Sequence, residues 1–191
     1  MILPRNYPVR LAQALAVAGA LLVALPSRPF AHEIPAAVSV LAFVKPEAHR
    51  LRVLARVPLE AIRDLDFPLQ STGFLDIART EALLPDAAKL WIADYIAVYE
   101  NDARLQGAQI VATRLSLPSD RSFGSYEDAL AHVRGAPLPA STDMIWQQAM
   151  LDVLIEYPIQ SDRSRFSIDP ALAHLGVKTT SVLRFLPPGG A

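Results

Sequence analysis

The residues of this chain that could bind a metal or transfer a proton are few and scattered. There is no cysteine, and the four histidines are His32, His49, His132 and His174. No two of them have the spacing of a helical metal-ligand pair, and the sequence contains no G-x-S-x-G nucleophile motif, phosphate-binding loop or dinucleotide fingerprint. The lack of cysteine also excludes disulfide bonds and thiolate metal sites. We therefore expect a protein that is not an enzyme.

His32 is the one histidine whose position suggests metal chemistry. Cleavage of the chain after Ala31 would make it the new N-terminus, where its α-amine and imidazole could chelate a divalent ion, with Glu33 as an oxygen ligand. This donor set suits nickel or copper. The alternative is a frayed terminus without a metal. We interpret the other three histidines as solvated surface residues.

Two segments, 119–123 (SDRSF) and 161–166 (SDRSRF), repeat the same order of residues directly after predicted strands. Serine and aspartate side chains often bond to the backbone in turns, so turn structure is the favoured interpretation. The alternative is a docking surface for another domain at one end of the sheet, formed by Asp120, Arg121, Asp162 and Arg163. A hydrolase would need Asp120, Asp162 and a histidine in one deep pocket, which no spacing predicts.

The first 31 residues have the pattern of a secretory signal peptide. Two arginines precede an apolar run over residues 11–25, and a polar breaker over 26–31 ends in a small residue. The run of 15 residues is shorter than the roughly 20 that span a membrane, which favours a signal over an anchor. Removing this segment takes away three arginines and no acid, so the formal charge falls from −1 to −4. We expect an exported, periplasmic protein without a nucleic-acid partner.

The remaining chain reads mainly as strands. Residues 145–159 alternate between apolar and polar positions, which predicts a central strand with one buried face. Residues 37–44 and 50–57 predict one hairpin, 96–100 and 103–117 a second, and 178–186 a final strand. In the first hairpin, Arg50, Arg52 and Arg56 are expected to form a solvated strand face, with an anion site as the alternative.

Short helices are expected between the strands, over residues 58–65, 85–95, 125–133 and 171–175, the last with Asp169 and Pro170 as cap and first residue. Because strands dominate and their connections look antiparallel, we predict an α+β, mainly β fold. It would be an antiparallel sheet, or a two-sheet sandwich similar to an immunoglobulin domain, with helices inserted in its loops. Residues 32–186 would form the single domain and 187–191 a linker.

Several short segments of the sequence, in this order along the chain, resemble the extracytoplasmic N-terminal region of the longer HupE/UreJ-like membrane proteins. They are residues 31–35 (AHEIP), 56–59 (RVPL), 90–93 (LWIA), 117–123 (LPSDRSF), 156–164 (EYPIQSDRS) and 183–190 (LRFLPPGG). In that family such a region leads into a bundle of membrane helices associated with uptake of nickel or related metals. This sequence stops at Ala191, before any such helix, so the resemblance transfers no metal residue to it.

The resemblance implies a non-catalytic binding or interaction domain of a HupE/UreJ-like metal-uptake protein. Its partner would be the downstream membrane helices or another protein of the cell envelope, and no small-molecule substrate is indicated. The domain would be attached to the membrane if the longer protein exists. The alternative is a stand-alone metal-binding or chaperone-like protein of the envelope, which requires metal binding that depends on His32.

Overall fold

The computed structural model describes residues 34–189, which contain eight strands and three short α-helices. The strands are β1 (Ala37–Glu47), β2 (Arg50–Pro58), β3 (Ile96–Glu100), β4 (Ala103–Arg104), β5 (Gln109–Ser116), β6 (Met150–Pro158), β7 (Phe166–Pro170) and β8 (Lys178–Phe185). The α-helices are α2 (Ile77–Glu81), α3 (Leu84–Trp91) and α4 (Tyr126–Val133). Single 3-10 turns are η1 (Leu59–Ala61), η2 (Ala93–Tyr95), η3 (Ser122–Gly124), η4 (Trp146–Gln148) and η5 (Leu172–Leu175). The predicted α+β, mainly β class is therefore confirmed.

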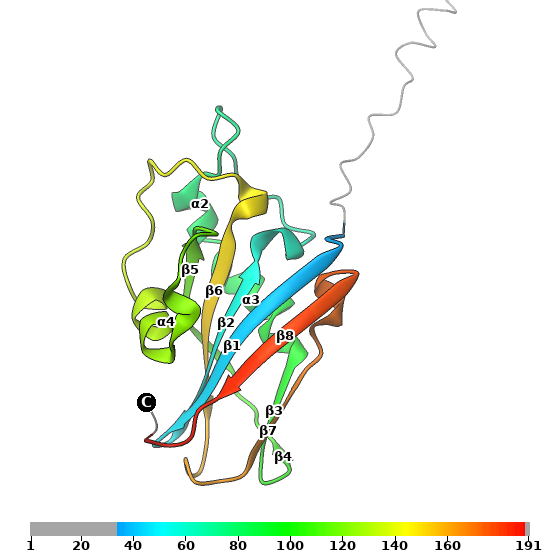
Figure 1. Ribbon diagram of the computed structural model, residues 1–191, viewed down its shortest axis with the longest axis vertical. Coiled ribbons are helices and arrows are strands. Elements are labelled where there is room, and N and C mark those ends of the chain that lie inside the picture. Colours follow the sequence, from blue (N-terminus) through cyan, green and yellow to red (C-terminus); the bar gives the residue numbers. More distant parts are fainter. Residues whose placement is uncertain (1–33, 190–191) are drawn as a thin grey trace, which may run out of the picture. The chain divides into compact units, whose positions relative to one another are not determined.

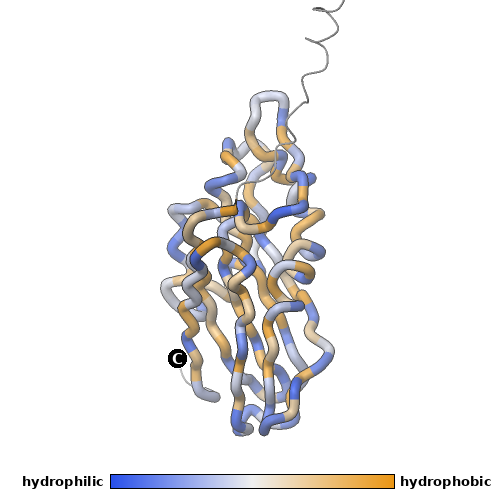
Figure 2. The backbone as a smooth tube through the Cα atoms, turned by 90° about the vertical axis from the view of Figure 1, so that its right-hand side faces the viewer, coloured by the Kyte–Doolittle hydropathy of each residue, from blue (hydrophilic) through white to orange (hydrophobic). Residues whose placement is uncertain are grey.

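The strands form two sheets. The larger has the order β5-β6-β2-β1-β8, which Figure 1 shows across the front of the molecule, and the smaller has the order β4-β3-β7. The predicted first hairpin is confirmed as β1 and β2, joined by a turn in which Ala48 has a φ of 52°. Polar residues gather at the turns at one end of the strands, as the blue segments at the bottom of Figure 2 show.

One strand pair departs from the antiparallel expectation. β8 runs parallel to β1, and all other pairs of described strands are antiparallel. The chain leaves the small sheet at β7, passes through η5 and enters the large sheet beside the start of β1, where the Val177 amide donates to the Pro35 carbonyl at 2.9 Å. Because the chain enters at that end, β8 must run in the same direction as β1.

The predicted strand over 103–117 is divided between the two sheets. β4 closes a two-strand turn with β3, and β5 pairs with β6 in the large sheet. The break contains Gly107, whose φ of 75° suits glycine and redirects the backbone. Pro170 ends β7 and does not begin a helix, so the expected helix at 171–175 is reduced to the 3-10 turn η5.

Two apolar clusters lie on opposite faces of the large sheet. The main core joins the inward residues of β1, β2 and β6 to α2, α3, β3 and η5, and its fully buried members include Leu51, Leu84 and Ile155. The second cluster packs Phe43, Leu54 and Leu154 against α4 and Phe123. No helix among the described residues is long and apolar enough to cross a membrane.

Strand β6 was predicted to have one buried face, and that prediction is wrong. Every residue from Leu151 to Tyr157 is buried, because α4 and the preceding loop cover the face that was expected to be exposed to solvent. The first residues of the predicted strand form η4 instead. The covering helix begins as expected: the Ser125 hydroxyl accepts the Asp128 amide at 3.1 Å, as an N-cap does.

Candidate functional site: two charge clusters beside helix α4

The register between β2 and β6 places charged residues opposite each other twice. Arg56 pairs with Asp152, and Arg52 pairs with Glu156. These positions are four residues apart on both strands, so all four side chains are on the face of the sheet that α4 covers. The apolar pair Leu54 and Leu154 lies between them. The outer face therefore holds two charge clusters separated by an apolar layer.

The first cluster, called here the aspartate cluster, consists of Arg56, Asp120, Asp152, Ser116, Ser122 and His132. Arg56 donates from Nε and Nη2 to the two oxygens of Asp152, at 2.6 Å each. Its Nη2 also donates to Asp120 Oδ1 at 2.8 Å, and its Nη1 donates to the Asp120 carbonyl at 2.9 Å. Arg56 and Asp152 are buried. One guanidinium thus satisfies two carboxylates.

Ser116, His132 and Asp120 lie in the order of a hydrolase triad. Ser116 Oγ is 2.7 Å from His132 Nε2, and His132 Nδ1 is 3.5 Å from Asp120 Oδ2. However, the single Ser116 hydroxyl proton is donated to Asp152 Oδ2 at 2.5 Å, so His132 Nε2 must donate to the serine oxygen. Nucleophile activation needs the opposite arrangement, with the histidine accepting. Ser116 is also fully buried, so a substrate cannot reach it without movement of the protein.

Asp120 is held as a carboxylate by its neighbours. Burial would raise its pKa, but hydrogen bonds from the Ser122 hydroxyl at 2.5 Å and from Arg56, with the nearby His132, lower the pKa to about 2. The Ser122 amide also donates to Asp120, at 2.9 Å. The expected turn structure at 119–123 is confirmed by this contact, although Asp120 pairs with the distant Arg56 and not with its neighbour Arg121.

The second cluster, called here the arginine cluster, consists of Glu156, Arg50, Arg52 and Arg134. Glu156 Oε1 accepts from Arg52 Nε at 2.9 Å and from Arg134 Nη2 at 3.3 Å, and Oε2 accepts from Arg50 Nη1 at 3.0 Å. Arg52 also pairs with Glu47. Three guanidiniums therefore surround one buried carboxylate. The prediction that the β2 arginines are exposed to solvent is correct only for Arg50. Arg56 and Arg52 lie beneath α4, where they pair with Asp152 and Glu156.

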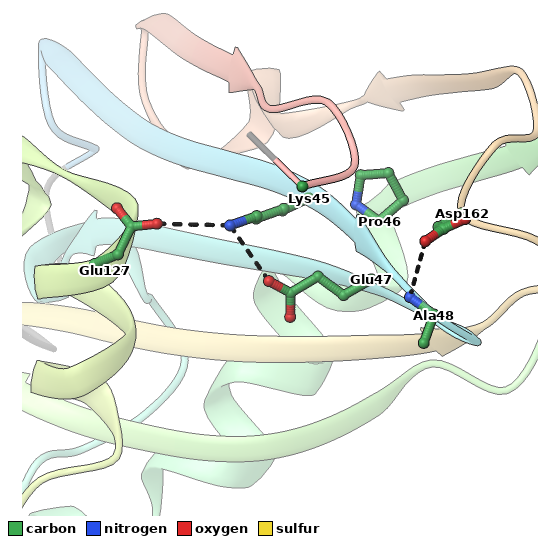
Figure 3. A pocket seen from close by; sticks show the side chains of 7 residues that line it. Lys45, Pro46, Glu47, Ala48, Glu127 and Asp162 are labelled. Atoms are coloured by element: carbon green, nitrogen blue, oxygen red, sulfur yellow. Dashed lines mark hydrogen bonds and ion pairs between the residues drawn. The ribbon is translucent and has the colours of Figure 1, made fainter. Parts of the chain in front are cut away.

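A shallow hollow of about 440 Å³ lies beside the arginine cluster, at the β1–β2 turn. Figure 3 shows Lys45 between Glu127 and Glu47, at 3.5 and 3.3 Å, and Asp162 pointing to the Ala48 amide at 3.3 Å. The lining carboxylates all have a donor. Among the described residues there is no group of three or more histidine, aspartate or glutamate side chains placed to hold a metal ion.

The two repeated segments, 119–123 and 161–166, do not form one surface. Asp120 contacts the beginning of β6 through Arg56 and Asp152, whereas Asp162 follows the end of β6 and contacts the β1–β2 turn. The expectation that they share one end of the sheet is therefore wrong. Arg121 and Arg163 are exposed, and His32 and Glu33 lie outside the described residues.

Of the other histidines, His49 is exposed as expected, whereas His132 and His174 are only partly exposed. His132 lies in the aspartate cluster, and His174 stacks on Tyr95 with ring centres 3.7 Å apart. Ser116, Asp152 and Glu156 were missed as candidates. One signal was available for the two acids: Arg52 and Arg56 have the same spacing in one strand as Asp152 and Glu156 in another.

Comparison with known proteins adds no identification. No protein-family model, no curated protein and no solved structure matches this chain significantly. The resemblance to HupE/UreJ-like proteins therefore stays a prediction.

Proposed function

We propose that this chain is a non-catalytic, exported binding domain of a HupE/UreJ-like metal-uptake protein, and that it docks to the membrane part of that protein through β8. The observation that carries the proposal is the free edge of the large sheet. β8 pairs only with β1 among the described strands, so its other side presents unpaired backbone groups. Such an edge is a ready site for an added strand.

The side chains of β8 support docking at this edge. Val182 is 42% exposed and Phe185 is 50% exposed. Val182 lies on the α4 side of the sheet, beside Phe43 and Phe123, and Phe185 lies on the other side, facing Phe166 at 6.4 Å. An added strand could therefore bury apolar surface on both faces while it pairs with the backbone.

The opposite edge of the same sheet provides a matched control. β5 is also an edge strand, and its Val111 is 44% exposed at a bulge. Bulges disturb the hydrogen-bonding row that an added strand needs. We therefore expect β5 to pair less well than β8.

The test measures co-sedimentation of the domain with vesicles that contain the membrane part of a HupE/UreJ-like protein. Val182→Lys combined with Phe185→Lys should abolish co-sedimentation, because two charges would be buried at the contact. Val111→Lys should leave it unchanged. Equal binding by both variants, or no binding by the unaltered domain, would refute docking through β8.

A further inference from the structure

The arginine cluster has more cations than its carboxylate needs. Glu156 accepts from Arg50, Arg52 and Arg134, and only Arg52 has a second acidic partner among the described residues, Glu47. Like charges this close repel each other, and the repulsion is weakened only where water reaches them. An additional anion would relieve it.

The surplus charge is on the solvent side. The side chains of Arg50 and Arg134 are 64% and 42% exposed, and each donates one side-chain hydrogen bond within the described residues, to a different oxygen of Glu156. Most N–H donors of both guanidiniums therefore remain for another acceptor. The guanidinium fork fits the paired oxygens of a carboxylate or phosphate.

A hollow of about 270 Å³ lies beside Arg50 and Glu156. His49, Arg50, Gln109 and Glu156 line it, with Tyr157 and Pro158. Gln109 and His49 supply further donors, and Glu156 is already neutralised by its three arginine partners. The hollow therefore combines room for a small ligand with an excess of hydrogen-bond donors.

From this geometry we propose that the hollow is a binding site for a small oxyanion, a carboxylate or a phosphate, held by Arg50 with His49 and Gln109 as secondary donors. Arg134 does not line the hollow, but it contacts the lining residue Glu156 and adds positive charge beside the site. The site does not depend on the proposed docking edge. It lies on β2, β5 and β6, and β1 separates these strands from β8. Failure of either proposal leaves the other intact.

The test is calorimetric titration of the full chain with inorganic phosphate and, separately, with malonate, at constant ionic strength set with chloride. Binding of either anion by the unaltered chain is expected, and the preferred one identifies the oxyanion. Arg50→Gln combined with Arg134→Gln should weaken that binding about tenfold or more, because one charge-assisted contact and one neighbouring positive charge are lost.

The matched control is Arg121→Gln combined with Arg163→Gln, which removes the same charge from two exposed arginines outside the hollow. It should change the affinity less than about twofold, since long-range charge effects are screened at this ionic strength. Melting temperatures of both variants establish that they fold. An equal loss of affinity in both pairs, or no binding of either anion by the unaltered chain, would overturn the site.

Discussion

The aspartate and arginine clusters lie on the same two strands and the same face, yet their charge balance is opposite. In the first, one arginine satisfies two carboxylates, and every member is buried or half-buried. In the second, one glutamate accepts hydrogen bonds from three arginines, and two of these arginines extend into solvent. The covering loop explains the difference, because residues 117–125 bring Asp120 and Ser122 over Arg56, whereas α4 ends before it covers Arg50.

This difference separates a structural role from a binding role. Buried charges must find all their partners within the protein, so the aspartate cluster has little capacity for a ligand. Exposed arginines keep unused donors, so the arginine cluster has that capacity. The same cross-strand pairing thus produces a structural contact where other residues bury it and a candidate binding site where it is exposed to solvent.

The largest expected effect is in the aspartate cluster. Asp152→Ala would leave Arg56 buried without its bidentate partner and should lower the free energy of unfolding by about 3–5 kcal/mol. Urea denaturation followed by circular dichroism measures this loss.

The double variant Arg56→Met with Asp152→Leu is the control for that substitution. Replacing both charges with apolar groups of similar size should restore much of the stability, because the fully buried charge is removed with its partner. Asp120 loses its contact with Arg56 but keeps the two hydrogen bonds from Ser122. A double variant as unstable as Asp152→Ala alone would show that packing, and not the unpaired charge, causes the loss.

The acid dependence of stability should come partly from Asp120. Its pKa is about 2 in the folded chain, below its ordinary value of 3.8, so the unfolded chain binds more protons between these values. Asp120 therefore stabilises the fold fully above about pH 4, by roughly 2 kcal/mol, and this contribution is lost as the pH falls towards 2. Denaturation curves between pH 5 and about 2 should be flatter for Asp120→Asn. Parallel curves for the two proteins would contradict this assignment.

Ser116→Ala tests the triad-like arrangement. Loss of the contacts to Asp152 and His132 should lower the free energy of unfolding by about 1–2 kcal/mol. Any slow ester hydrolysis by the chain should be unchanged, since the serine proton is directed to Asp152. Loss of measurable hydrolysis in this variant, with the fold intact, would instead identify Ser116 as a nucleophile.

The smallest effect is expected in the arginine cluster. Arg134→Gln should change the free energy of unfolding by less than about 1 kcal/mol, because the pair with Glu156 is exposed on the arginine side and two arginines remain. The change should shrink further in high salt. A loss as large as that of Asp152→Ala would mean that the two clusters do not differ as described.

Much of the fold could be predicted because its signals are local. The β1–β2 hairpin, the strand character of 178–185 and the Ser125 cap follow from alternation and side-chain chemistry within a few residues. The failures have non-local causes. The second buried face of β6 depends on α4, and the direction of β8 depends on where the chain re-enters the sheet.

The sequence by itself determined the mainly β class, the lack of disulfide chemistry and the matched spacing of Arg52 and Arg56 with Asp152 and Glu156. Only the tertiary structure decided which of these charges are buried. Cross-strand pairing depends on register, and burial depends on what packs over the sheet, neither of which local spacing specifies. For that reason the arginines of β2, whose spacing predicts one solvent-exposed face, have different environments. Arg56 forms a buried structural contact, and Arg50 contributes to an exposed cationic surface.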